Sequence, residues 1–202
     1  MMDILSYVIA AVVGYLLGNI QCAVLLSRWK YHDDVRKHGS GNAGSTNMFR
    51  VFGMRSGFIT FIGDFLKGIV GVLLGRLLAG EIGGYIAALF VVLGHDFPAF
   101  MQFQGGKGVA TTFGIAWIFQ PFYAMVLTLI AGIILLLTKT VSVASLVGAL
   151  VYALMVALFS WHNTYFLITT ALLCLLIFIR HISNIERITK GTEGKLFHES
   201  KK

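Results

Sequence analysis

The chain has 202 residues, of which 57% are hydrophobic and only 12% are charged, and its mean hydropathy is +0.81. This composition excludes an ordinary soluble protein and predicts an integral membrane protein. Sixteen Lys and Arg residues against nine Asp and Glu residues give a net charge of +7. Because the basic residues lie between apolar runs, we expect membrane lipid and anionic substrates as partners, and no nucleic acid.

Apolar runs of about 20 residues cross a bilayer as helices, since a helix satisfies its own backbone hydrogen bonds there. The sequence predicts an all-α membrane protein with seven transmembrane helices in one domain, residues 1–202. Pro121 favours either a short fourth helix with a tight turn or a longer kinked pair. The first run lacks the basic segment of a signal peptide, so we expect a retained helix. The expected spans cover about residues 3–27, 55–80, 82–103, 109–120, 122–138, 141–160 and 163–180.

Basic residues near span ends mark the cytoplasmic face of a membrane protein. With seven spans and the N-terminus outside, only Arg76 among the basic loop residues falls on the outer face. The C-terminus is then cytoplasmic. The residues on the inner face are Arg28, Lys30, Arg36, Lys37, Arg50, Arg55, Lys107, Lys139, Arg180, Arg187, Lys190, Lys195, Lys201 and Lys202.

The first inner loop contains the segment Gly39-Ser40-Gly41-Asn42-Ala43-Gly44-Ser45-Thr46-Asn47, and Arg50 follows it. Its glycines let backbone amides approach and surround an anion, and Arg50 adds a guanidinium suited to phosphate. The segment is a candidate phosphate cradle, with a flexible polar loop as the alternative. The nearby Asp33 and Asp34 favour a solvated charge cluster over a metal site, and we expect neither a metal nor a cofactor.

Two ionisable residues, Asp64 and Lys67, lie three positions apart inside the second span. Charges at that depth usually pair, so we expect a structural or site-supporting pair rather than a proton relay. His95 and Asp96 end the third span, where they either line the same site or only terminate the helix. Small-residue pairs such as Gly14 and Gly18, or Gly71 and Gly75, favour close helix packing; a dimer contact is the alternative, which leaves the oligomeric state open.

Three further polar clusters fall on the same predicted inner face. Gly105-Gly106-Lys107-Gly108 offers backbone amides and a point charge to a phosphate, although a glycine turn with a membrane-surface lysine is the alternative. Ser142 begins the sixth span, where a capping role is the simpler interpretation. After the seventh span, His181 and Asn184 share a helical face and could contact one ligand together. The alternative is a solvated, basic juxtamembrane segment.

These motifs, in this order, resemble the three signature regions of the bacterial acyl-phosphate:glycerol-3-phosphate acyltransferase family (PlsY-type). The resemblance implies an enzyme of the inner (plasma) membrane that transfers a fatty acyl group from acyl phosphate to glycerol 3-phosphate. The products are 1-acylglycerol 3-phosphate (lysophosphatidic acid) and phosphate, in the first step of phospholipid synthesis. A transporter or channel for a phosphorylated solute is the alternative, but the polar motifs gather at one face and no inverted repeat is visible.

The same resemblance implies which residues form the site. The catalytic residues would be Ser40, Arg50, Lys107, His181 and Asn184. The substrate-binding residues would be Gly41, Asn42, Gly44, Thr46, Asn47, Gly105, Gly106, Gly108 and Ser142. Glu186 resembles an acidic residue of the last motif, with an expected structural role. Acyl phosphate carries a good leaving group, so positioning and charge stabilisation suffice, and either His181 or the leaving phosphate takes the proton.

Overall fold

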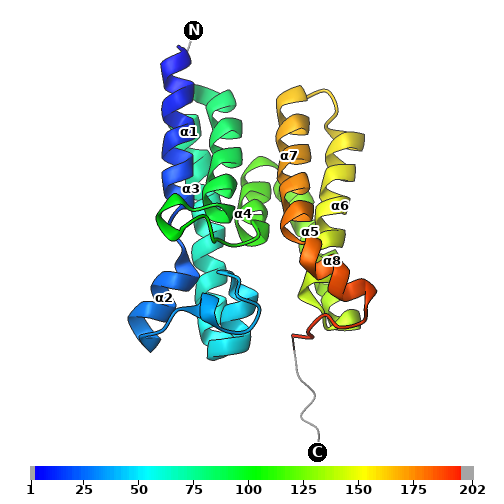
Figure 1. Cartoon of the computed structure of the whole chain (residues 1–202). Coiled ribbons are helices and arrows are strands. Elements are labelled where there is room, and N and C mark those ends of the chain that lie inside the picture. The colour runs from blue at the N-terminus through cyan, green and yellow to red at the C-terminus, as the bar shows by residue number, and fades with distance from the viewer. Residues whose placement is uncertain (1–2, 197–202) are drawn as a thin grey trace, which may run out of the picture.

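The computed structural model describes residues 3–196, and over that range the chain forms helices and no strand (Figure 1). The predicted all-α fold is therefore confirmed. Lys201 and Lys202, which were expected on the inner face, lie outside the described residues. The α-helices are α1 (Ile4–Gly18), α2 (Cys22–Tyr31), α3 (Ser45–Asp96), α4 (Val109–Phe119), α5 (Pro121–Thr138), α6 (Val141–Phe159), α7 (Thr164–Arg180) and α8 (Ile182–Thr189); the short 3-10 helices are η1 (Val35–Lys37) and η2 (Ala99–Met101).

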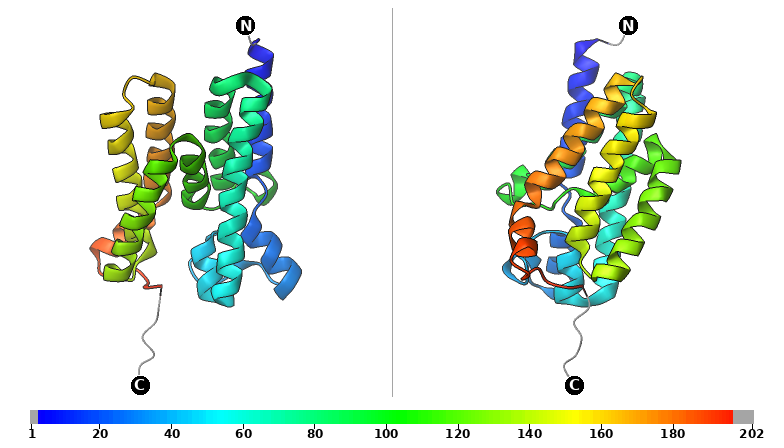
Figure 2. Two further views of the ribbon diagram at one scale, coloured as in Figure 1. Left: turned by 180° about the vertical axis from the view of Figure 1, so that it is seen from behind. Right: turned by 90° about the vertical axis from the view of Figure 1, so that its right-hand side faces the viewer.

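Helix α3 folds back on itself instead of forming one rod. The backbone leaves helical geometry at Ala79 and at Gly80, where φ is +64°, and the chain reverses there. On either side of the reversal, Gly75 and Gly83 lie so close that a side chain on either would overlap the carbonyl of the other. Figure 2 shows the two limbs side by side. The reversal agrees with the predicted boundary between the second and third spans.

The helix expected over residues 3–27 is wrong in one respect, because it is interrupted between Gly18 and Cys22. Backbone carbonyls freed inside a membrane protein need other donors. Two buried side chains supply them: the Gln21 amide donates to the Gly18 carbonyl at 3.1 Å, and the Lys67 ammonium donates to the Ile20 carbonyl at 2.8 Å. Gln21 and Lys67 thus stabilise the break, although in a hydropathy pattern they are only polar residues within apolar runs.

The third expected span is also shorter than predicted, because α3 ends at Asp96 and not at residue 103. Pro98 follows, and a proline disfavours helical geometry in the residue before it. At the next boundary α4 ends at Phe119 and α5 begins with Pro121 at its first position, which is where a proline is compatible with a helix. The short helix with a tight turn is therefore the correct one of the two predicted forms.

Within residues 3–196, four segments are long and apolar enough to cross a bilayer: Ile4–Tyr31, Ser45–Met101, Pro121–Thr138 and Val141–Phe159. A fifth is added if α7 and α8, which meet at an angle of 56°, count as one bent span. The segment Ser45–Met101 contains the α3 hairpin, and α4 is shorter than the others. Large apolar side chains such as Leu77, Leu136 and Leu137 lie exposed on the outside of these helices, as a lipid-facing surface requires.

Close packing within the chain explains the predicted small-residue pairs. A Cβ atom on Gly14 would lie 2.8 Å from the Ala87 carbonyl oxygen, and one on Gly71 would lie 3.2 Å from the Val91 side chain. These glycines therefore bring α1 and the two limbs of α3 together, and the prediction of helix packing is confirmed. In Figure 1, α1 to α3 form one group of helices and α5 to α7 another, with α4 between them.

Candidate active site

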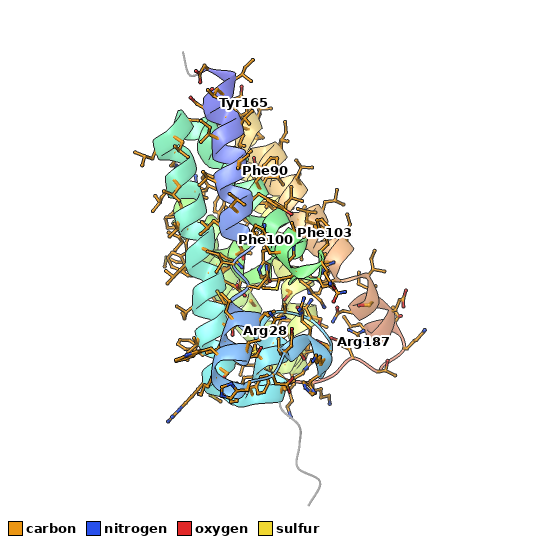
Figure 3. All side chains as sticks on the ribbon, turned by 60° about the vertical axis from the view of Figure 1, so that its left-hand side comes forward. Arg28, Phe90, Phe100, Phe103, Tyr165 and Arg187 are labelled. Carbon is orange, nitrogen blue, oxygen red and sulfur yellow. The ribbon has the colours of Figure 1, made fainter. Side chains whose placement is uncertain are left out.

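A polar cavity of about 140 Å³ lies where the loops before α3 and α4 meet helix ends of both helix groups. Figure 3 shows Arg28 on α2 and Arg187 on α8 at this end of the molecule, with Tyr165 at the other end. Most of the predicted site residues line the cavity, namely Ser40, Asn42, Gly44, Thr46, Asn47, Arg50, Lys107, Ser142, His181 and Asn184. The predicted glycines Gly41, Gly105, Gly106 and Gly108 are not among its lining residues and instead shape the two loops beside it.

The first loop is built around the buried side chain of Asn47. Its amide oxygen accepts a hydrogen bond from the Ser40 N–H at 2.9 Å, and its amide nitrogen donates to the carbonyls of Val35, His38 and Asn42 at 3.0 to 3.1 Å. One side chain therefore ties both ends of the loop to the start of α3. Because the loop backbone occupies this amide, substrate binding by Asn47 stays a prediction, whereas its role in shaping the loop is visible.

The second loop, Gly105 to Gly108, lies directly against the end of α3. The Gly106 N–H donates to the His95 carbonyl at 2.9 Å, and a side chain on Gly106 would overlap the His95 imidazole. Gly108 has a φ of +70°, a conformation that favours glycine. On the other side, Arg180 donates from Nε to the Gly106 carbonyl at 3.0 Å. The loop thus joins α3 to the end of α7 and fixes the direction of Lys107.

A hydrogen-bond network joins Lys107 to the second helix group. The Lys107 ammonium donates to the Asn184 amide oxygen. The Asn184 amide nitrogen donates to Ser142 Oγ at 2.8 Å and to Glu193 Oε1 at 2.7 Å, and Ser142 Oγ donates to the same Oε1 at 2.6 Å. Arg187 Nε donates to Glu193 Oε2 at 2.7 Å. Residues from four separate segments are therefore connected at one edge of the cavity.

Glu193 is a site residue that sequence reasoning missed. Burial raises the pKa of its carboxyl, but hydrogen bonds from Ser142, Arg187 and Asn184 outweigh this and lower the pKa below its ordinary value, so the group is ionised at neutral pH. The acidic residue chosen from the sequence, Glu186, is instead exposed on α8. Glu193 lies in an irregular segment after α8, where no periodicity or motif indicates a buried role.

For three other ionisable residues, the structure corrects or completes what the sequence predicted. Asp34 was expected in a solvated cluster, but it is buried and paired with Arg28 at 2.9 Å and Arg36 at 2.8 Å. The guanidinium of Arg36 holds the pKa of Asp34 well below its usual range. Asp64 and His95 were given only as possible neighbours of the site, and both line the polar cavity.

The protonation states of two cavity residues follow from their surroundings. Burial lowers the pKa of the Lys107 ammonium to about 8, although the nearby Glu193 carboxylate opposes this. Burial and the Lys107 charge lower the pKa of His181 to about 4, so its imidazole is neutral at pH 7. His181 Nδ1 lies 2.8 Å from the Ile177 carbonyl oxygen, which can only accept, so Nδ1 carries the proton and Nε2 a free lone pair.

A second cavity of about 300 Å³ adjoins the first, between α4, α5 and α6. Its walls are almost entirely apolar, and they include Phe113, Leu127 and Leu135. The two cavities share the lining residues Phe61, Val109, Val141 and Ser145. A ligand with an anionic head and an apolar tail matches this pair of adjoining surfaces.

The fold and these cavities define an integral membrane protein with a cation-lined polar site beside an apolar one. Residues 8–191 match the family model described as glycerol-3-phosphate acyltransferase. The chain is 40% identical over 189 residues to the glycerol-3-phosphate acyltransferase of Thermoanaerobacter pseudethanolicus, covering 94% of this chain and 95% of that one. It is 38% identical over 185 residues to that of Bacillus subtilis, covering 92% and 95%.

Solved structures agree with the sequence comparison. The glycerol 3-phosphate form of PlsY (YgiH), an integral membrane glycerol 3-phosphate acyltransferase, matches with a TM-score of 0.89 and 33% identity, over 96% of both chains. The lysophosphatidic acid form matches with a TM-score of 0.85 and 32% identity, over 94% of this chain and 95% of that one. The chain belongs to the glycerol-3-phosphate acyltransferase family.

The lowered pKa of Lys107 predicts the pH dependence of the free enzyme. Because an ammonium loses its charge above its pKa, kcat/KM for glycerol 3-phosphate should fall as the pH rises through about 8. Lys107→Arg keeps a charge at high pH, so this variant should lack the fall in that range, whatever its absolute activity. Rate measurements from pH 6 to 10 test this; parallel declines in the parent and in Lys107→Arg would contradict it.

Proposed function

We propose that the protein transfers a fatty acyl group from acyl phosphate to glycerol 3-phosphate, and releases 1-acylglycerol 3-phosphate (lysophosphatidic acid) and phosphate. The observation that carries this proposal is the junction of the two cavities at Phe61, Val109, Val141 and Ser145. An acyl phosphate lies across such a junction with its phosphate in the polar cavity and its chain in the apolar one. Family membership makes transport of a phosphorylated solute the disfavoured alternative.

In this proposal the phosphate groups are held by positive charge and by loop donors. Lys107 and Arg50 both line the polar cavity. Arg50 donates from Nη2 to the Gly194 carbonyl at 2.7 Å, which leaves other guanidinium N–H groups for an anion. Ser40, Asn42 and Thr46 add neutral donors, and Asn184 and Ser142 hold Lys107 in place through the network with Glu193.

The chemistry requires one bond to form and one to break. A hydroxyl oxygen of glycerol 3-phosphate attacks the acyl carbonyl carbon, and the bond from that carbon to the phosphate oxygen breaks with its electron pair leaving on phosphate. The hydroxyl proton needs an acceptor, and the phosphate that departs with the bonding electron pair is a trianion, which is a far stronger base than His181 with its pKa of about 4. The leaving phosphate therefore takes the proton, and His181 Nε2 accepts a hydrogen bond that orients a substrate hydroxyl.

We propose seven crossings of the inner (plasma) membrane, with the N-terminus outside and the site cytoplasmic. Counting α1, the two limbs of α3, and α4 to α7 gives this number. The start of α1 and the described end of the chain at Leu196 lie at opposite ends of the bundle (Figure 1), as an odd number of crossings requires. The basic residues of the inner loops support the orientation.

Thiol labelling in intact cells tests this topology. A cysteine at Asp3 should react with a membrane-impermeant reagent, whereas one at Lys195 should react only after the membrane is opened, since Lys195 is exposed but on the inner face. Reaction of both cysteines in intact cells, or of neither, would contradict an odd number of crossings.

A transfer assay tests the proposed function. Purified protein given acyl phosphate and glycerol 3-phosphate should form lysophosphatidic acid and release one phosphate for each ester formed. Lys107→Ala and Arg50→Ala should each lower kcat/KM by about 10- to 100-fold, since a hydrogen bond to a charged group contributes roughly 1.5 to 3 kcal/mol. Arg50→Lys should recover only part of the loss, because it keeps the charge without the planar fork.

Matched controls for these variants are Lys190→Ala and Arg55→Ala, whose side chains are exposed and do not line the polar cavity. Both should transfer at the parental rate. If Lys107→Ala and Arg50→Ala proteins elute and unfold like the parent and are as active as these controls, the polar cavity is not the phosphate site.

The apolar cavity leads to a separate prediction about the length of the acyl chain that the protein accepts. Gly148 lines that cavity, and a Cβ atom there would meet nothing within 4 Å, so Gly148→Phe places a ring in open space. Use of long-chain acyl phosphates should fall by about tenfold or more, while short-chain donors remain substrates. Leu150→Phe, on the exposed side of α6, is the control. Equal losses for long and short donors would place the acyl chain elsewhere.

A further inference from the structure

A buried polar cluster lies behind the polar cavity, and neither the motifs nor the proposed chemistry uses it. It consists of Asp64 and Lys67 from the first limb of α3 and His95 from the end of the second limb. These side chains are at most 5% exposed. Asp64 and His95 line the cavity, while Lys67 lies deeper.

The Lys67 ammonium sits at the centre of this cluster. Its nitrogen lies 2.8 Å from Asp64 Oδ1 as an ion pair, and it donates to the Ile20 carbonyl at 2.8 Å. His95 Nδ1 is 2.7 Å from the same nitrogen. An ammonium group has three protons and no lone pair, so it can only donate to the imidazole. A buried charge needs an oppositely charged partner, and Asp64 is that partner for Lys67.

This contact determines which imidazole nitrogen carries a proton. Because His95 Nδ1 accepts from Lys67, it has no proton, and a second positive charge on the ring beside the ammonium is disfavoured. The single ring proton is therefore on Nε2, and His95 is a neutral donor. The contacts run from Asp64 to Lys67 and from Lys67 to His95. Asp64 positions the Lys67 ammonium, and the ammonium determines the tautomer of His95.

The Nε2 edge of the ring faces the glycine loop. A side chain on Gly106 would overlap Nε2 and Cε1, so only glycine fits against this edge of the imidazole. Among residues 3–196, Nε2 has no hydrogen-bond partner, while the His95 backbone carbonyl holds Gly106 at 2.9 Å. The loop that carries Lys107 thus packs beside an N–H donor that has no partner among the described residues, on a ring that lines the polar cavity.

We propose that His95 is a substrate-binding residue that donates from Nε2 to a phosphoryl oxygen in the polar cavity, with Asp64 and Lys67 as positioning residues that hold it in this tautomer. The inference rests on the proposed placement of phosphate in that cavity. Both glycerol 3-phosphate and acyl phosphate have phosphoryl oxygens, and separate KM values for the two substrates distinguish them.

Two substitutions at His95 separate donation from structural support. The side-chain amide of Gln reaches the place of Nε2, whereas that of Asn reaches only the place of Nδ1. His95→Asn keeps an acceptor for Lys67 and loses the cavity donor, so KM for one substrate should rise by about 10- to 100-fold with a smaller change in kcat. His95→Gln keeps a donor and should raise the same KM by less than about tenfold.

The exposed His162, in the loop between α6 and α7, provides matched controls as His162→Asn and His162→Gln. The reverse order, with His95→Asn near the parent and His95→Gln impaired, would show that His95 only supports Lys67 and would overturn the proposal. Parental KM values in both His95 variants would overturn it as well. Lys107→Ala in the same assay tests the phosphate site separately from the role of His95. An unchanged KM in Lys107→Ala would contradict the phosphate site itself.

If the His95 variants fail to fold, NMR of the parent protein tests the proposed tautomer of His95 and its contact with substrate. In protein labelled with ¹⁵N-histidine, the His95 signals should be those of a neutral ring with the proton on Nε2, and the Nε2 signal should shift when glycerol 3-phosphate or a non-transferable acyl phosphate analogue is added. A proton on Nδ1, or no shift with either compound, would overturn the proposal.

Discussion

The hydrogen bond from Lys107 to Asn184 connects the two groups of helices at the site. Lys107 comes from the loop that packs on α3, and Asn184 comes from α8 beside α7. Asn184 is held in turn by Ser142 and Glu193, so the position of one ammonium depends on four segments. A charge in a largely apolar protein has to be partnered, and this requirement draws these loops together. The cation that we propose for phosphate binding also organises the site.

The same constraint explains why the polar cavity ends where the apolar one begins. Val109 and Val141 follow Gly108 and Thr140 directly, at the start of α4 and α6. Each helix therefore presents polar loop atoms on one side of its first turn and apolar side chains deeper in the bundle. The proposed substrate, with a charged head and a long chain, matches this pair of surfaces.

Much of this arrangement could be predicted from the sequence, because hydropathy and glycine-rich loops are local signals. The helical fold follows from such patterns, and the short helix before Pro121 is one of the two forms that they allow. Ten of the lining residues follow from the resemblance of the loop motifs to a known family. The interruption after Gly18 and the role of Glu193 follow from neither. Both depend on partners far along the chain, such as Lys67 for the Ile20 carbonyl and Ser142 for the Glu193 carboxylate. Long-range contacts of this kind leave no periodic trace in the sequence.

The central claim is that one cation-lined cavity binds the phosphate of the acyl acceptor. A crystal structure of this protein with glycerol 3-phosphate tests it most directly. The account predicts the phosphate in the polar cavity, within hydrogen-bond distance of Lys107 Nζ and the Arg50 guanidinium. A bound glycerol 3-phosphate at another place, with this cavity holding only water, would contradict it.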